Sequence, residues 1–343
     1  MRSVKRATEV SVEQLRRMKP GELNALLSGD PAEAARWVEL AARHGLAAAQ
    51  LRLGRMLLDG TGLGQDQAAA LGWFKTAARS GDADAMNMAG RCYENGWATP
   101  KDNETAADWY RRSAEGGHDW GEYNYANMLF DGLGVTADPP LAVQWYLKAA
   151  AKGHSRAMNQ IGRCYEEGWG VSKDHASAAE WYRQSAEGGY FRGQYNYATL
   201  LGLAGRAEEA AGWFGRAAEG GNIDIRRRIG RELLGDNLPV FHPVGLRALA
   251  LACESGDASD FYHYGRVLLH GFHCTRNEAA AIASLRRAAR QGHEDAAAEL
   301  GRAGYSMLEP LDSAPMPPPE RKRGIRRLLS SAGRRPESRA QRR

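Results

Sequence analysis

The chain has 343 residues, of which 43% are hydrophobic and 25% are charged; this composition fits a folded protein and excludes a low-complexity chain. The formal net charge of +5 hides an uneven distribution. Residues 320–343 hold ten Lys or Arg and two Glu, a net of +8, and residues 1–19 hold six and two, a net of +4. Residues 20–319 therefore hold 30 basic and 37 acidic groups, a net of −7.

No run of about 18 apolar residues occurs, so no membrane-spanning helix is expected. The N-terminal residues are basic but lack the apolar core of a signal peptide. Both features predict a cytoplasmic protein, although export by another route stays open. The four cysteines are expected to be reduced thiols, since Cys92 and Cys164 lie 72 residues apart at equivalent positions, too distant for a disulfide.

An internal repeat dominates the sequence. Glycines recur with steps of 36, 36, 36, 36, 32, 35 and 36 residues, and a Trp stands eight residues before each of the first six. The glycines are Gly45, Gly81, Gly117, Gly153, Gly189, Gly221, Gly256 and Gly292. Periods of 20–50 residues are typical of a stack of identical supersecondary units, which excludes a domain with one closed core.

In chain order, residues 1–29 form a basic N-terminal segment for which we expect short capping helices, and residues 30–305 form the repeat array. One unit shows the pattern. A first helix is predicted over 83–94, and a turn rich in helix breakers ends on Asp102, a capping residue. A second helix is predicted over 103–115, where Trp109 and Tyr110 share one apolar face.

The second half departs from this pattern. After Leu203 the glycine-rich loop is missing, so a tighter turn is expected there, and residues 235–245 place two prolines in the next loop. Ala248 then replaces the repeat Trp. We expect a change of curvature between about 200 and 250. Residues 306–319 are predicted to be a proline-rich linker and residues 320–343 a disordered basic tail.

The repeat resembles the Sel-1-like repeat family, a branch of the tetratricopeptide superfamily, in its bacterial form. The match is good over 158–174 (MNQIGRCYEEGWGVSKD) and continues at 178–182 (AAEWY) and 185–189 (SAEGG). The resemblance implies an all-α, right-handed α-solenoid of about eight helix-turn-helix repeats, with the first helix of each pair lining the concave face. It also implies a non-enzymatic scaffold or adaptor that binds a partner protein or peptide.

One face of the first helices carries a column of arginines, with Asn or Tyr four residues earlier. The predicted partner-binding residues are Arg55, Asn87, Arg91, Tyr123, Asn127, Asn159, Arg163, Tyr195, Arg231, Tyr262 and Arg266. Guanidinium groups bind carboxylates, and Tyr and Arg dominate binding hot spots, so the column predicts a groove for an extended peptide or an acidic protein segment. Alternatively, the arginines pair with Glu94, Glu166 or Glu232 and hold the helices in register.

The remaining sequence features are weaker evidence for a function. The basic tail could contact an anionic membrane or nucleic acid, which is the alternative function. His263, His270, His273 and Cys274 lack the spacing of a metal site, so no metal and no cofactor are expected. The column of Trp and Tyr in the second helices is predicted to be core. No catalytic motif is recognised, and an enzyme is not expected.

Overall fold

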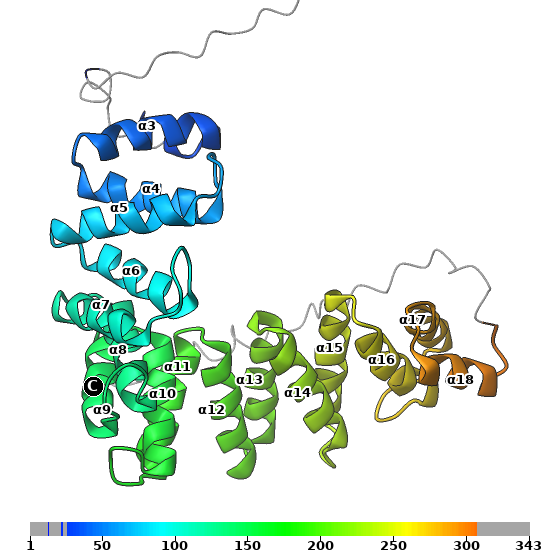
Figure 1. Cartoon of the computed structure of the whole chain (residues 1–343). Helices are drawn as coiled ribbons and strands as arrows, with labels where there is room; N and C mark the ends of the chain where they lie inside the picture. The colour runs from blue at the N-terminus through cyan, green and yellow to red at the C-terminus, as the bar shows by residue number, and fades with distance from the viewer. Residues whose placement is uncertain (1–12, 14–21, 23–25, 307–343) are drawn as a thin grey trace, which may run out of the picture. The chain divides into compact units, whose positions relative to one another are not determined.

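The computed structural model describes residues 26–306, together with Glu13 and Glu22. In these residues all regular secondary structure is helical, as predicted (Figure 1). The helices are α3 (Pro31–Arg43), α4 (Ala47–Asp59), α5 (Gln67–Arg79), α6 (Ala83–Asn95), α7 (Asn103–Glu115), α8 (Asp119–Asp131), α9 (Pro139–Ala151), α10 (Ser155–Glu167), α11 (His175–Glu187), α12 (Phe191–Leu203), α13 (Ala207–Gly220), α14 (Ile223–Gly235), α15 (His242–Ala252), α16 (Ala258–His270), α17 (Glu278–Arg290) and α18 (Glu294–Arg302), with a short 3-10 turn, η1 (Cys253–Ser255).

The helices from α4 to α17 alternate as first and second helices of the repeat. Contacts pair α4 with α5, α6 with α7, α8 with α9, α10 with α11, α14 with α15, and α16 with α17. Local sequence sets the helix ends. Asp102 and Asp174, for example, cap second helices by accepting backbone N–H groups with their carboxylates. The repeat glycine after each second helix takes a left-handed conformation, as at Gly81 (φ 85°), but Gly221 (φ −85°) does not, because α13 continues to Gly220.

Five of the described pairs are closed by a glycine of the first helix that lies against a large side chain of the second. A Cβ on Gly90 would lie 2.8 Å from the Tyr110 ring, and one on Gly162 would lie 2.6 Å from Tyr182. Tyr110 is fully buried, while the preceding Trp109 is half-buried. The core prediction for the Trp/Tyr column is therefore confirmed, with the second aromatic of each pair buried more deeply.

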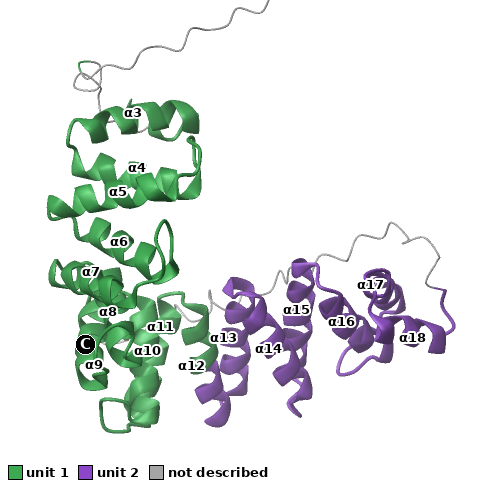
Figure 2. Ribbon diagram, in the orientation of Figure 1, with its two compact units in different colours: residues 1–197 green, residues 198–343 purple. Residues whose placement is uncertain are grey.

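The helices pack into two compact units, residues 1–197 and 198–343, which Figure 2 colours separately. The boundary falls within α12, next to the shortened repeat. There α12 ends at Leu203 and α13 begins at Ala207, so the predicted tight turn is confirmed. The predicted change of curvature concerns the relation between the units and stays a prediction. The predictions for the N-terminal segment, the proline-rich linker and the basic tail fall almost entirely outside the described residues.

In the first unit the first helices form a layer of their own, which we call the first-helix layer: α4, α6, α8, α10 and the start of α12. Asparagine pairs link its members. Asn124 donates from Nδ2 to Oδ1 of Asn87 (2.8 Å), and Asn196 donates to Asn159 (2.9 Å). In the second unit, α13 also contacts α15, so second helices touch there. None of the described helices is both long and apolar enough to cross a membrane.

Candidate functional site

Arg91 and Arg163, the two arginines of the repeated RCYE segment, are exposed and stack on tryptophans. The Arg91 guanidinium lies 5.3 Å from the ring centre of Trp97, and that of Arg163 lies 5.2 Å from Trp169. Each tryptophan lies in the loop that directly follows the helix carrying its arginine. A cation over an indole face is attracted by the ring, and this contact still leaves N–H donors of the guanidinium open to a ligand.

The glutamates named as structural partners bind tyrosines. Tyr110 donates its hydroxyl to Glu94 (2.5 Å) and Tyr182 donates to Glu166 (2.6 Å), each across a helix pair. Burial, followed by the nearby carboxylate, raises the pKa of both phenols. Within the part of the chain that the structure describes, Arg91 forms no ion pair. The glutamates thus hold the pairs together through tyrosine.

Glu232 accepts from Arg228 (2.9 Å), a neighbour four residues away on α14. Arg55, by contrast, does have a structural partner: its Nη2 lies 2.7 Å from both carboxylate oxygens of Asp84, so it joins α4 to α6. Asn127 accepts a hydrogen bond from the Tyr146 hydroxyl (2.7 Å). The predicted column therefore contains both structural and unpaired members.

The other predicted binding residues differ in how deeply their side chains are buried. Asn87 and Asn159 are 4% and 3% exposed and are occupied by the asparagine links described above, and Tyr195 is 6% exposed. Tyr123 and Tyr262 are half-buried. Tyr123 stacks on His154 with ring centres 4.7 Å apart, and Tyr262 lies 4.3 Å from His293 and under the Arg266 guanidinium.

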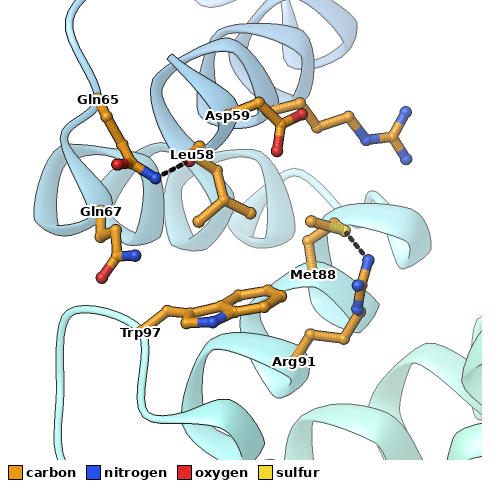
Figure 3. A pocket seen from close by; sticks show the side chains of 8 residues that line it. Leu58, Asp59, Gln65, Gln67, Met88, Arg91 and Trp97 are labelled. Carbon is orange, nitrogen blue, oxygen red and sulfur yellow. Dashed lines mark hydrogen bonds between the residues drawn. The ribbon is translucent and has the colours of Figure 1, made fainter. Parts of the chain in front are cut away.

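A pocket of about 480 Å³ opens between α4 and α6 at the Arg91–Trp97 stack (Figure 3). Trp97 and Leu58 face each other across it, and Met88 and Arg91 form one side. Its lining is completed by Arg55, Asp59, Gln65 and Gln67. Gln65 is held in place because its Nε2 donates to the Leu58 carbonyl (2.8 Å). The pocket thus joins apolar walls to charged and amide groups.

The second unit contains a pocket of about 200 Å³ at the same position of its repeat. It lies between α14 and α16 and is lined by Gly230, Arg231, Leu234, Leu249, His263, Arg266, Val267 and Phe272. Arg231 and Arg266 occupy the repeat positions of Arg55 and Arg91, and Phe272 occupies that of Trp97. The Arg266 Nε is buried without a hydrogen-bond partner. Two column arginines and a loop aromatic therefore come together in both units.

Five of the eight residues that line the pocket of the first unit change in the next copy of the 72-residue double repeat, and the neighbouring Ala98 changes as well. Phe130 stands where Leu58 does, and its ring meets Trp169 edge-on at 5.3 Å. Gly170 stands where Ala98 does, and a Cβ on Gly170 would lie 2.5 Å from the Pro139 backbone. A loop with alanine at this position cannot approach the preceding repeat as closely. Leu58 and Ala98 thus leave the space open.

Sequence reasoning did not assign the loop aromatics to the site, although the repeated RCYE-x-G-W segment contained the signal: a Trp six residues after each column arginine. It also missed Trp120 and Arg156, which lie seven residues before Asn127 and Arg163 and so share their helix faces.

The other candidate groups are placed elsewhere. His270 pairs with Glu299 (2.6 Å), and the described residues contain no group of three His, Cys, Asp or Glu side chains arranged to hold a metal. Cys92 and Cys164 are buried free thiols, and burial raises the pKa of each to about 11. Such thiols are poor nucleophiles at neutral pH.

Comparison with known proteins identifies the repeat. The Sel1 repeat profile matches residues 22–46, 47–82, 83–118, 121–154, 155–190, 192–222 and 262–293. Residues 223–261, which the profile does not match, include the loop with two prolines. A search of curated proteins found no match.

Among solved structures, a Sel1 repeat protein from Oxalobacter formigenes is 28% identical, with a TM-score of 0.62 over 68% of this chain and 99% of that one. A protective antigen of uropathogenic Escherichia coli strains, which displays an SLR fold, is 27% identical over 82% of this chain and 70% of that one, with a TM-score of 0.45. The profile matches cover more than half of the chain, so the chain belongs to the Sel1 repeat family.

Proposed function

We propose that this chain is an adaptor that binds an acidic segment of a partner protein along its first helices. Proteins built from Sel1 repeats generally act as scaffolds for protein–protein interaction, and the fold is typically non-catalytic. Arg91 and Arg163 would bind the segment in the first unit, and Arg231 and Arg266 would bind it in the second. We also propose that it acts without a cofactor, in the cytoplasm.

The observation that carries this proposal is the repetition of one pocket design in both units. Each pocket is lined by two column arginines, a loop aromatic ring and apolar side chains. An acidic side chain fits this combination, because its carboxylate accepts from guanidinium while its methylene groups cover the ring.

The repeat also sets the spacing of the contacts. Neighbouring helices pack about 8–10 Å apart, and an extended chain advances about 3.3 Å per residue. Side chains that enter successive repeats would therefore be about three residues apart in the partner. Asn87, Asn159 and Tyr195 are left out of the proposed contact set because they are buried. The alternative function, through residues 320–343, lies outside the described residues and stays a sequence prediction.

The test compares charge reversals in the two helix layers. The double variant Arg91→Glu/Arg163→Glu removes two first-helix cations. Its control, Arg112→Glu/Lys148→Glu, makes the same charge change at two cations that stack on tryptophans of second helices, Arg112 at 4.2 Å and Lys148 at 3.5 Å. Both variants must keep the wild-type circular dichroism.

Tagged proteins would be purified from the source cell, and the protein that co-purifies with the wild type would be quantified. We expect the first-helix variant to lose at least about 90% of it and the control to keep it. Retention by the first-helix variant, or equal loss by the control, would contradict the proposal.

A further inference from the structure

A second cluster of exposed aromatic and cationic side chains lies at the other end of the first helices, away from the pocket. The second residues of α8, α10 and α12 are Trp120, Arg156 and Arg192, spaced by 36 residues. Trp120 is 40% exposed and Arg156 is exposed. All of these residues belong to the first unit.

The Arg156 guanidinium is held between two rings that come from different repeats. It lies 5.0 Å from the ring centre of Trp120 and 5.6 Å from that of Tyr190, the residue that precedes α12. Arg192 in turn lies 5.9 Å from the Phe191 ring, which contacts Tyr190 at 5.2 Å. The rings and guanidinium groups therefore alternate along three successive first helices.

His154 and Tyr123 pack against Trp120 and hold its ring in place. The ring centres of His154 and Trp120 are 4.6 Å apart, edge to face; Tyr123 stacks on His154 and also meets the Trp120 ring edge-on at 6.1 Å. His154 is 6% exposed, and its Nδ1 accepts the backbone N–H of Ala157 (3.1 Å), which caps α10. Trp120 is thus fixed at its base while its outer face meets solvent.

Among the described residues, the two guanidinium groups contact rings but no polar partner. Over residues 26–306, neither Arg156 nor Arg192 forms a hydrogen bond or an ion pair. The neighbouring carboxylate, Asp119, accepts the backbone N–H of Trp120 (2.8 Å). Arg112 makes a comparable stack on Trp109, but that pair sits on one helix, three residues apart, as expected of packing within a repeat. Arg156 is instead oriented by three repeats with its donors free.

We propose that Trp120, Arg156, Tyr190 and Arg192 form a second subsite, which binds a carboxylate next to an apolar side chain in a partner polypeptide. The stacked guanidinium presents its planar donors to the carboxylate, and the Trp120 face covers the apolar neighbour. Because the rings already fix the arginine, little side-chain freedom is lost on binding.

Charge favours a short acidic segment over a long polyanion. Residues 26–197 hold 17 Lys or Arg and 21 Asp or Glu, a net of −4, so the positive charge is confined to local spots. The phosphates of a long nucleic acid would be repelled by the surrounding carboxylates.

The subsite is separate from the Arg91–Trp97 pocket and does not depend on the proposed function. The two do share α10, where Arg156 and Arg163 are seven residues apart on one face, about 10 Å along the axis. A single extended segment could reach both.

The experiment selects binders from a phage-displayed library of random dodecapeptides on the full-length protein. We expect the selected peptides to be enriched in Asp or Glu beside an aromatic or aliphatic residue. Their affinity should fall at least about tenfold for Arg156→Gln and for Trp120→Ala, and should be unchanged for the control Arg112→Gln. Unchanged urea midpoints would show that the variants fold. If Trp120→Ala does not fold, the affinity of the peptides for Arg156→Gln still tests the subsite.

Three results would overturn the inference. The first is a selection that yields no binders or no acidic enrichment. The second is full affinity of the selected peptides for Arg156→Gln, with loss only for Arg91→Glu/Arg163→Glu; this outcome would leave the proposed function standing. The third is tighter binding of a labelled oligouridine than of any peptide, with the same dependence on Trp120 and Arg156, which would make the cluster a nucleic-acid site.

Discussion

The two copies of the 72-residue double repeat share one set of contacts but differ beside them: a pocket opens at Trp97 in the first copy, whereas the Phe130 ring packs on Trp169 in the second. In both, a column arginine stacks on a loop tryptophan and a tyrosine hydroxyl binds a glutamate. The first copy has Leu58 and Ala98 at the joint, whereas the second has Phe130 and Gly170. Four other lining residues also differ between the copies, so exchanging Leu58 and Ala98 with their counterparts tests how much these two positions contribute to the open joint.

The largest expected effect comes from exchanging the loop residues. Gly170 has φ 70°, and an added Cβ would lie 2.5 Å from the Pro139 backbone. Gly170→Ala should lower the free energy of unfolding by about 3 kcal/mol, since strain in the left-handed region and overpacking add. Ala98, with φ 67°, should respond in the opposite direction, so that Ala98→Gly gains roughly 0.5 kcal/mol.

Urea unfolding of both variants measures this pair. A loss at Gly170 below about 1 kcal/mol would mean that the loop moves away without cost, and the explanation for the open pocket would then fail.

The second exchange concerns the pocket walls. Leu58→Phe should fill the pocket and weaken binding of the acidic partner about tenfold, a change of about 1.4 kcal/mol, while the urea midpoint stays near the wild-type value. Phe130→Leu should remove the ring that meets Trp169 and open the second joint. Titration of the partner measures both. Binding unaffected by Leu58→Phe would remove this pocket from the interface.

A third test separates the roles of arginine and tyrosine. Tyr182→Phe removes the hydroxyl that donates to the Glu166 carboxylate. It should lower the free energy of unfolding by about 1 kcal/mol. The loss is smaller than for a fully buried carboxylate because Glu166 is partly exposed. Arg163→Gln should change stability by less than about 0.5 kcal/mol. The reverse order would restore the interpretation in which the arginines hold the helices in register.

The smallest effect is a pH dependence that arises from His154. Burial lowers its pKa below the ordinary value of about 6.5. Above pH 6.5 the folded and unfolded chains are both neutral at this residue. As the pH falls below 6.5, the unfolded chain takes up a proton that the folded chain excludes, so stability decreases.

His154→Asn keeps a residue able to cap α10 but removes this titration. We therefore expect a smaller loss of stability between pH 7 and pH 5 in the variant than in the wild type, measured by urea midpoints. Equal losses would show that His154 does not contribute.

The sequence predicted most of the fold because its signals are local. The 36-residue period, the capping aspartates and the missing loop after Leu203 all act within one repeat, and the structure confirms each of them. The family resemblance was confirmed as well.

The site was harder to predict because its contacts cross repeats. Asn87 has the spacing of a surface residue, but Asn124 of the next repeat buries it. Arg156 looks like an ordinary first-turn residue until Trp120 and Tyr190 are placed on either side of it. No periodicity within one helix specifies such neighbours, so the sequence indicated a column of arginines without showing which members were free.

Hydrogen exchange with and without the purified partner tests the central claim most directly, since it reports which helix layer the partner covers. In a bound first unit, protection should increase at the exposed ends of α6 and α10 and in the loops that carry Trp97 and Trp169, with little change in α7 and α11. Protection confined to the second helices α7 and α11 would contradict the account.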